Sequence, residues 1–377
     1  MIIKKAYKYR LYPNEEQRVL LAKTFGCVRF IWNKQVEAFE SYDKETNPNP
    51  PILSKKDLEG NYPWLNEVSA AALQQKQRDF IEFKRQRFNN ERKTKIEDPV
   101  YKSRKSRQSF RLPNQKFKLS GNRIRLERIG WVRMVKDRDI PENARFLSCT
   151  VSMNKSGQYF VSILVEVEMV YKRKTGLSVG VDLGVKELAT LSDGTVFHNP
   201  KFLRERQARI SRMQEILSRK KRGSKRRRRL QMRINRIYRD VRNERDWYTH
   251  NLTTYLVNNY DVICIEDLNV SGMMKNHRLA YSISDSCFAT IRSQLEYKCA
   301  WYGKELVVID RFFPSSKTCS SCGWKNNNLT LSDRVFKCDN CGYQIDRDLN
   351  AAINIKAVGV DAAQRTPDGS NPVVMSV

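Results

Sequence analysis

The sequence predicts a multidomain α/β protein. The chain of 377 residues is longer than one ordinary domain, and its 40% hydrophobic residues are enough for at least two cores. Its pattern changes along the chain: residues 1–90 combine one strand with helical periodicity, whereas residues 95–170 show short alternating runs separated by Gly, Asn and Pro. Farther on, apolar strands alternate with helices, which is typical of an α/β core.

The N-terminal half is expected to contain a β-barrel and a helical segment. Residues 2–11 have an imperfect strand alternation, and Asn14 can cap the helix that should follow. The later β-rich region can pair with this first strand. The sequence therefore predicts a barrel-like domain made of residues 1–10 and 95–172, with a mostly helical lobe, residues 11–94, between its two parts.

The C-terminal half is expected to be a three-layer α/β core with an insertion. Apolar strands separated by helical periodicity begin near Leu177, Asp261 and Lys304. The predicted core comprises residues 173–312 and 344–360, and residues 313–343 form a separate inserted module. Residues 361–377 contain a Pro-Asp-Gly-Ser-Asn-Pro run, so they are expected to form a disordered tail.

The composition indicates a folded protein that binds a polyanion. The formal net charge is +29, yet the chain has 16 Phe, 16 Tyr and 6 Trp, which a basic disordered tail would lack. A membrane partner is the competing interpretation, but no apolar run approaches the roughly 18 residues that a spanning helix needs. The N-terminus also has no signal-peptide pattern. We therefore expect a cytoplasmic protein.

About half of the excess charge lies in one helical segment, residues 201–245, which has nineteen Lys and Arg against four Asp and Glu. An apolar stripe is expected to keep one face packed; its members are Ile210, Met213, Ile216, Leu217, Leu230, Ile234 and Ile237. A solvated surface is the simplest interpretation of such a run, but a basic ridge on two antiparallel helices favours contact with phosphates. The predicted nucleic-acid-binding residues are Arg219, Lys220, Lys221, Arg222, Lys225, Arg226, Arg227, Arg228 and Arg229.

Four of the nine cysteines form two close pairs. Cys319 and Cys322 are separated by fifteen residues from Cys338 and Cys341, and a glycine follows each pair. Four thiolates at this spacing suit a closed tetrahedral zinc site, which is structural because no position is open for a substrate. Redox pairs or disulfides are the weaker alternative, since a reducing cytoplasm disfavours them.

Three acidic residues interrupt or follow apolar elements: Asp182 and Glu266 at the ends of strands, and Asp348 at the start of a helix. Singly, each fits an ordinary turn or cap residue. Together they supply the hard oxygen ligands that two magnesium ions, about 3.5–4 Å apart, need for phosphodiester cleavage. Asp267 should point to the opposite face of its strand, and Asp346 is expected to be a supporting or exposed residue. Beside Asp182, Gly184 is expected to leave room for a substrate backbone.

Six segments of the sequence resemble a known family. They begin at Tyr7, Phe25, Val181, Ile265, Phe313 and Asp346 and read YKYRLYPN, FGCVRFIWN, VDLG, IEDL, FPSSKTCSSCG and DRDLNAAINI. In these segments, spread over nearly the whole chain, the sequence resembles the transposon-encoded TnpB proteins, which are relatives of the type V CRISPR effector nucleases.

The resemblance implies an RNase H-like RuvC nuclease core with an inserted zinc ribbon. It places Asp182, Glu266 and Asp348 at the catalytic, magnesium-binding positions, because the third motif has its aspartate two residues before Asn-Ala-Ala. It also implies a β-barrel wedge domain, a helical recognition lobe and a monomer. The implied partners are a guide RNA made from the transposon end and target DNA, double- and single-stranded, beside a short DNA motif.

The expected function is therefore RNA-guided DNA cleavage by an insertion-sequence protein. The nearest alternative, an RNA-guided repressor without nuclease activity, is expected to lack one or more of the three acidic residues. A single-strand transposase would need a paired-histidine metal site, and the three histidines are far apart in the sequence. A plain zinc-ribbon DNA binder would not explain the three carboxylates.

Overall fold

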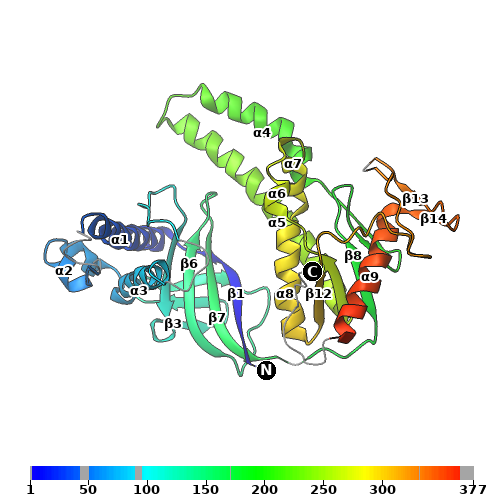
Figure 1. Cartoon of the computed structure of the whole chain (residues 1–377). Coiled ribbons are helices and arrows are strands. Elements are labelled where there is room, and N and C mark those ends of the chain that lie inside the picture. The colour runs from blue at the N-terminus through cyan, green and yellow to red at the C-terminus, as the bar shows by residue number, and fades with distance from the viewer. Residues whose placement is uncertain (1, 43–50, 90–95, 170, 331, 366–377) are drawn as a thin grey trace. The chain divides into compact units, whose positions relative to one another are not determined.

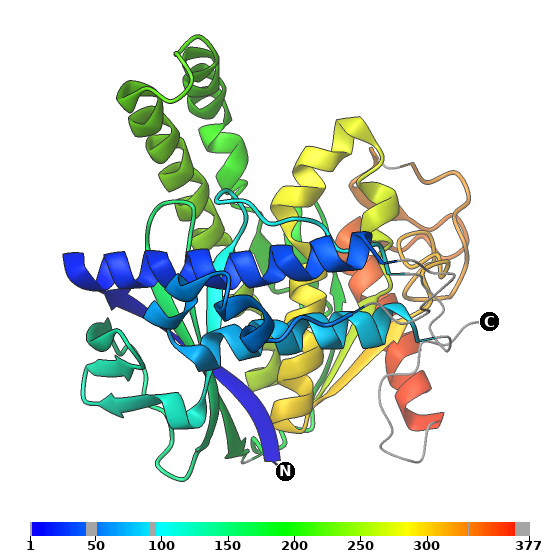
Figure 2. The same ribbon diagram turned by 90° about the vertical axis from the view of Figure 1, so that its left-hand side faces the viewer.

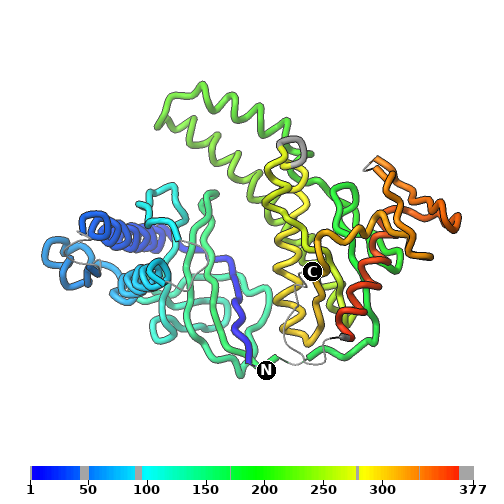
Figure 3. Tube along the Cα trace, viewed as in Figure 1, coloured from blue at the N-terminus to red at the C-terminus, as the bar shows by residue number. Residues whose placement is uncertain are grey.

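The protein consists of two compact units, Met1–Glu168 and Met169–Val377. The computed structural model describes residues 2–42, 51–89, 96–169, 171–330 and 332–365. Figure 1 labels the elements and Figure 3 traces the chain through them. Every helix within these described ranges is too short or too polar to traverse a lipid bilayer.

A seven-stranded antiparallel sheet forms the centre of the first unit. Its strands are β1 (Ile2–Tyr12), β2 (Gln108–Pro113), β3 (Phe117–Ser120), β4 (Arg123–Leu126), β5 (Gly130–Val135), β6 (Arg145–Met153) and β7 (Tyr159–Glu168), paired in the order β2-β6-β7-β1-β5-β4-β3. The predicted pairing of the first strand is confirmed, because β1 pairs with β7 over nearly its whole length. The short 3-10 helix η2 (Asn114–Lys116) connects the two edge strands and contacts both, so the sheet is nearly closed and barrel-like.

Alternating side chains explain why β1 forms and where it lies. Ile3, Tyr7, Tyr9 and Leu11 are buried on one face, whereas Lys8 on the other face is exposed. This period of two places the apolar set in the core of the barrel and the basic set on its outer surface. The strand extends to Tyr12, so the helical lobe begins after the predicted boundary at residue 11.

Helices cover this sheet. They are α1 (Glu15–Glu40), α2 (Lys55–Glu59), the 3-10 helix η1 (Pro63–Glu67) and α3 (Ala70–Arg87). The predicted cap is confirmed: Asn14 Oδ1 accepts a hydrogen bond from the backbone N–H of Gln17 (2.8 Å), and the backbone N–H of Asn14 donates one to Oε1 of Gln17 (3.1 Å). Helix α1 packs on α3 partly through aromatic rings, such as the pair Trp32 and Phe80, whose ring centres are 5.4 Å apart.

A five-stranded mixed sheet forms the second unit. Its strands are β8 (Ser178–Asp182), β9 (Glu187–Leu191), β10 (Val196–His198), β11 (Val262–Glu266) and β12 (Glu305–Ile309), in the order β10-β9-β8-β11-β12. Strand β11 lies parallel to both β8 and β12, and the β8–β9 and β9–β10 pairs are antiparallel. The strands predicted near Leu177, Asp261 and Lys304 are therefore confirmed and lie side by side.

Helices lie on both faces of this sheet, which confirms the predicted three layers. On one face α5 (Lys225–Asn259) and α8 (Phe288–Tyr302) share a core with β8 and β11, in which Leu256 and Ile291 are fully buried. On the other face Ile355 of α9 (Arg347–Arg365) packs against Cys264 and Ile309. The remaining helices are α4 (Phe202–Ser218), α6 (Val270–Met273) and α7 (His277–Ser286).

Helix α9 continues to Arg365, farther than the sequence suggested. The prediction that disorder begins at residue 361 is wrong for residues 361–365, because the helix extends without interruption through them. The rest of the predicted tail, residues 366–377, lies outside the described residues.

The inserted module between β12 and α9 is a small ribbon. It contains the two-stranded antiparallel sheet of β13 (Val335–Lys337) and β14 (Gln344–Asp346). Phe336 is fully buried and packs with Cys319 and Cys338. A single aromatic side chain is a very small core, so this module depends on other constraints for its stability.

Candidate functional site

Two of the predicted acidic residues lie next to each other at one edge of the five-stranded sheet. Asp182 is the last residue of β8, and Glu266 is the last residue of β11. These strands are parallel and adjacent, with Val181 opposite Ile265, so both carboxylates emerge at the same ends of the strands. In open α/β sheets this edge, outside the carboxyl ends of parallel strands, is where ligands bind.

The third acidic residue, Asp348, comes from the first turn of α9. Asp346 fixes this turn, because its Oδ1 accepts hydrogen bonds from the backbone N–H groups of Asp348 (2.9 Å) and Leu349 (3.0 Å). Asp346 is exposed and acts as a helix cap, in agreement with the supporting role that the sequence suggested. Arg347 donates from Nε (3.0 Å) and Nη2 (2.8 Å) to Oδ1 of Asp348.

The pKa shift of Asp182 indicates that the three carboxylates lie close to one another. The pKa of Asp182 is raised to about 8, first by burial and then by the negative charges of Glu266 and Asp348, while Arg347 opposes the shift. Burial also raises the pKa of Glu266, and a hydrogen bond from the Ser315 hydroxyl counteracts it. Residues that are far apart in the sequence therefore share one site, in which the charges of Glu266 and Asp348 disfavour ionisation of Asp182.

This donor set fits a divalent cation. Clustered, partly desolvated carboxylates are stabilised by a bound cation, and oxygen ligands are those that magnesium prefers. The carboxylates are more loosely grouped than the cysteines: over the described part of the chain, the four cysteines are the one set of possible ligands whose atoms all lie within 4.8 Å of one another.

The four cysteines form a compact thiol cluster in the inserted ribbon. The sulfurs of Cys319 and Cys341 are 3.7 Å apart, and those of Cys322 and Cys338 are 3.5 Å apart. The glycine after each pair has a positive φ, and its backbone N–H donates to the carbonyl oxygen of the first cysteine of the pair, which closes a tight turn around each pair. The pKa of Cys322 is lowered to about 6 by the backbone N–H of Trp324 and by Asn340, which favours a thiolate that could hold a metal.

Two arginines near the acidic site were not predicted. Arg292 of α8 and Arg311, which follows β12, both form ion pairs with Asp267. The pKa of Asp267 is lowered, mainly by its hydrogen bond from Arg311 and also by Arg292. Asp267 thus holds two guanidinium groups. No sequence motif gives this cluster, because it depends on the adjacency of β11, β12 and α8.

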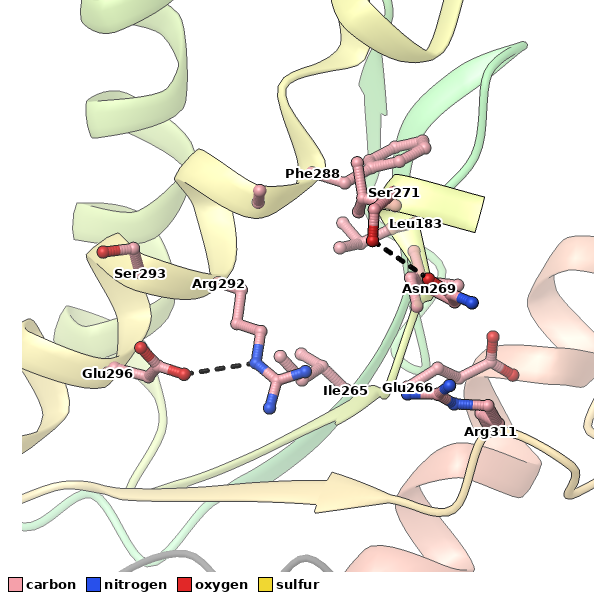
Figure 4. A pocket seen from close by; sticks show the side chains of 13 residues that line it. Leu183, Ile265, Glu266, Asn269, Ser271, Phe288, Arg292, Ser293, Glu296 and Arg311 are labelled. Carbon is pink, nitrogen blue, oxygen red and sulfur yellow. Dashed lines mark hydrogen bonds and ion pairs between the residues drawn. The ribbon is translucent and has the colours of Figure 1, made fainter. Parts of the chain in front are cut away.

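A cavity of about 540 Å³ lies beside Glu266. Figure 4 shows the side chains that line this cavity. They include apolar ones, such as Leu183 and Phe288, and charged ones, namely Glu266, Arg292 and Arg311. Of the three acidic residues, Glu266 lines this cavity, which has both apolar and cationic walls.

At two positions near Asp182 the structure explains why the residue is glycine, and the sequence alone did not show this reason. A Cβ on Gly184 would lie 2.9 Å from the carbonyl oxygen of Glu187, so the chain itself fills the space predicted for a substrate. A Cβ on Gly180 would collide with the backbone of α9 at Ala352 and Lys356. Gly180 therefore permits the close helix–strand contact that holds the start of α9 near β8.

The predicted basic residues surround the turn between α4 and α5, a hairpin that projects from the sheet of its own unit (Figure 2). Seven of the nine are exposed, whereas Lys220 and Arg227 are half-buried. Arg227 donates to the carbonyl oxygen of Lys220 (3.1 Å) and to that of Leu217, so it caps the end of α4. The predicted apolar stripe is buried at four of its positions, but Ile216 is 42% exposed and does not belong to it.

Comparison with known proteins identifies the fold class of this protein. The chain matches the family profiles described as "Probable transposase" over residues 162–277, "Cas12f1-like, TNB domain" over 288–355 and "Helix-turn-helix domain" over 1–45. In the structure the described part of the last of these segments, residues 2–42, holds strand β1 and the long helix α1. The fold resembles the protein chain in a cryo-EM structure of a Cas12f1–sgRNA–target DNA complex, with a TM-score of 0.55, 13% identity and coverage of 94% of this chain and 99% of that one. The protein therefore has a Cas12f1-like fold.

Full-length relatives define the family. A protein from Streptomyces pristinaespiralis named "Putative RNA-guided DNA endonuclease" is 38% identical over 98% of this chain and 92% of its own. The Escherichia coli K12 protein named "Putative RNA-guided DNA endonuclease InsQ" is 30% identical over 94% of this chain and 92% of its own. The chain belongs to this family, the TnpB proteins of IS605-type transposons.

Proposed function

We propose that this protein is an RNA-guided DNA endonuclease, and that Asp182, Glu266 and Asp348 form the catalytic site at which it hydrolyses phosphodiester bonds of DNA. The observation that carries the proposal is that the charges of Glu266 on β11 and Asp348 on α9 both act on the buried carboxyl of Asp182 on β8 and raise its pKa, which supports one shared acidic site. The relatives named as RNA-guided DNA endonucleases support the substrate and the guide.

The three carboxylates would hold two magnesium ions. When bound, the ions supply a water activated for attack and stabilise the leaving oxygen. The chain's own residues prepare the site: Ser315 orients Glu266, and Asp346 orients the turn that presents Asp348. Arg347 supplies positive charge next to Asp348, which limits the repulsion among the acidic groups.

The four cysteines would hold one structural zinc ion. Their closed arrangement leaves no position for a substrate, and among the described residues of the ribbon Phe336 is the one fully buried apolar side chain. The metal therefore contributes folding free energy to the ribbon rather than chemistry.

The proposed partners are a guide RNA from the transposon end and target DNA, bound by a monomer. The barrel-like sheet of the first unit would be the wedge domain, its helices the recognition lobe, and the second unit the RuvC domain with its zinc ribbon. The exposed arginines of the α4–α5 hairpin supply phosphate contacts that do not depend on sequence, as a guide-directed enzyme requires. An inactive RNA-guided repressor is not favoured, because all three carboxylates are present and converge.

The test uses the protein purified with its RNA, and a plasmid library with variable sequence beside the target. We expect cleavage in magnesium, and no cleavage in EDTA or after Asp182→Ala. Glu305→Gln, which removes an exposed carboxylate from the neighbouring strand β12, is the matched control and should cleave normally. Cleavage by the Asp182→Ala protein at the wild-type rate would refute the proposal.

A further inference from the structure

The loop that follows β12, residues 310–315, connects an exposed aromatic ring to the acidic site. At one end of the loop, the hydroxyl of Ser315 donates a hydrogen bond to Glu266. In the middle, Phe312 is 85% exposed, more than any other large hydrophobic side chain of the described residues. Its neighbour Phe313 packs instead against the cluster of Cys264 and Ile309. Adjacent phenylalanines thus have opposite environments, one in the core and one in solvent.

The exposure of Phe312 does not come from a loosely held loop. The backbone N–H of Phe312 donates to Oδ1 of Asp310 (2.7 Å), and that of Phe313 donates to the carbonyl oxygen of Asp310 (3.2 Å). Asn354 of α9 donates to the carbonyl oxygen of Ser315 (2.8 Å). The loop is therefore held at both ends, and the ring is presented to solvent at little cost in conformational entropy on binding.

Arg311 adds a cation beside this ring. Its Nε and Nη2 donate to Asp267, yet its side chain is 41% exposed and lines the cavity that contains Glu266 (Figure 4). A guanidinium group that is fixed by one carboxylate keeps further donors for a phosphate oxygen. Arg311 and Phe312 therefore offer a phosphate contact and a stacking surface in consecutive positions, next to the acidic site.

We propose that Arg311 and Phe312 form a subsite for the DNA strand that is cut: Arg311 contacts a backbone phosphate, and Phe312 stacks on an unpaired base close to the scissile bond. This inference rests on the proposed endonuclease function. Stacking suits a guided enzyme, because every base has a π-face and the contact imposes no sequence preference that would compete with the guide.

The direct test places the fluorescent base 2-aminopurine at successive positions around the cut site of the target. The protein is the RNA complex carrying Asp182→Ala, so that the strand is bound but not cut. We expect quenching at one or two positions, its loss with Phe312→Ala or Phe312→Leu, and its retention with Phe312→Trp. Trp247→Ala, which removes another exposed aromatic ring (64% exposed) from the same unit, is the control and should keep the quenching.

The second readout is cleavage in the background with all three carboxylates intact. Loss of one base stack corresponds to about 5- to 150-fold in affinity, so Phe312→Ala should lower cleavage at limiting protein within this range, while thermal stability is unchanged. Arg311→Lys, which keeps the charge but not the planar fork, tests the phosphate contact. Its cleavage rate should lie between those of wild type and Arg311→Ala.

The outcomes separate this inference from the function on which it rests. If the Asp182→Ala protein itself cuts DNA, the proposed function fails whatever Phe312 does. If the wild type cuts in a magnesium-dependent way but Phe312→Ala leaves both quenching and rate unchanged, the function stands and the subsite is refuted. A change in oligomeric state with Phe312→Ala, without any change in quenching, would show that the ring contacts protein and would also overturn the subsite.

Discussion

Ser315 donates its hydroxyl hydrogen to Oε1 of Glu266, across 49 positions of sequence. Ser315 is only 6% exposed, and its carbonyl oxygen is held by Asn354 of α9. The bond stabilises the ionised form of Glu266 against the effect of burial, which raises the pKa of this carboxyl. One serine thus links the loop after β12 to a proposed metal ligand and to the helix that presents Asp348.

The first prediction concerns this serine. Ser315→Ala should weaken metal binding about 10- to 100-fold, the usual cost of losing a partner that orients a metal ligand. The measurement is cleavage rate against magnesium concentration, and the midpoint should move to higher magnesium while the rate at saturation changes less. Ser316→Ala, at the adjacent half-buried serine, is the control. Identical magnesium curves for wild type and Ser315→Ala would count against the role.

The second prediction concerns the packing of α9 on β8. Gly180→Ala places a methyl group where the backbone of Ala352 and Lys356 lies, and backbone cannot move aside as a side chain can. We expect a loss of about 1–3 kcal/mol or more in the free energy of unfolding, as for overpacked cores, measured by thermal unfolding and protease sensitivity. Gly60→Ala is the control, because its φ of −62° is ordinary and nothing lies within 4 Å of the added Cβ.

The third prediction separates two kinds of arginine in the α4–α5 hairpin. Arg228 and Arg229 are exposed, so Arg228→Ala with Arg229→Ala should weaken RNA binding and lower the slope of log affinity against log salt by about 0.7 for each phosphate that is no longer neutralised. Arg227→Ala should instead destabilise the hairpin, because its side chain caps α4. Binding across a salt series and circular dichroism of each variant distinguish the two. An unchanged slope in the double variant would refute the phosphate contacts.

The fourth prediction concerns the thiol cluster. Zinc measured by mass spectrometry should be about one ion per chain, the content expected of a closed four-thiolate site, and Cys338→Ser should reduce it. The ribbon should then become sensitive to protease, since Phe336 is the one fully buried apolar side chain that the structure describes in it. Cys149→Ser is the control, because this cysteine is buried in the first unit, whereas the ribbon belongs to the second. A Cys338→Ser protein with full zinc and normal protease resistance would be incompatible with the site.

The sequence predicted well those features that depend on local periodicity or fixed spacing. The alternation of Ile3, Tyr7, Tyr9 and Leu11 predicts which face of β1 is buried, because a strand has a period of two. The cysteine spacing likewise predicts the thiol cluster, because two knuckles and four sulfurs need little else from the fold.

The sequence did not predict features that depend on contacts between elements far apart along the chain. The pairing of Asp267 with Arg292 and Arg311 arises only when α8 and β12 pack beside β11. Ile216 fits the helical periodicity of the stripe, but packing between the two helices of the hairpin leaves it 42% exposed. Gly180 has no distinguishing feature in the sequence, since the backbone of α9 that excludes a side chain there is far along the chain.

The last prediction uses a buried lysine between α5 and α8. Lys298 is 6% exposed, and its ammonium donates to the hydroxyls of Thr253 (2.6 Å) and Thr254 (2.8 Å) and to the carbonyl oxygen of His250 (3.1 Å). Burial lowers the pKa of Lys298 to about 8, and the positive charge of Lys172 acts in the same direction.

Because the pKa of Lys298 is lower in the folded state than the ordinary value of 10.5, the unfolded chain binds more protons between about pH 8 and pH 10.5. Folding stability from this group should therefore rise with pH across that window and be constant below it. The measurement is the difference in melting temperature between wild type and Lys298→Met at a series of pH values. From pH 8 upward, the melting temperature of wild type should rise relative to that of the variant. Lys186→Met, at an exposed lysine, is the control variant and is measured over the same pH series. A constant difference between wild type and Lys298→Met across the window would mean that Lys298 keeps its charge in the folded protein, stabilised by the two threonine hydroxyls and the carbonyl oxygen.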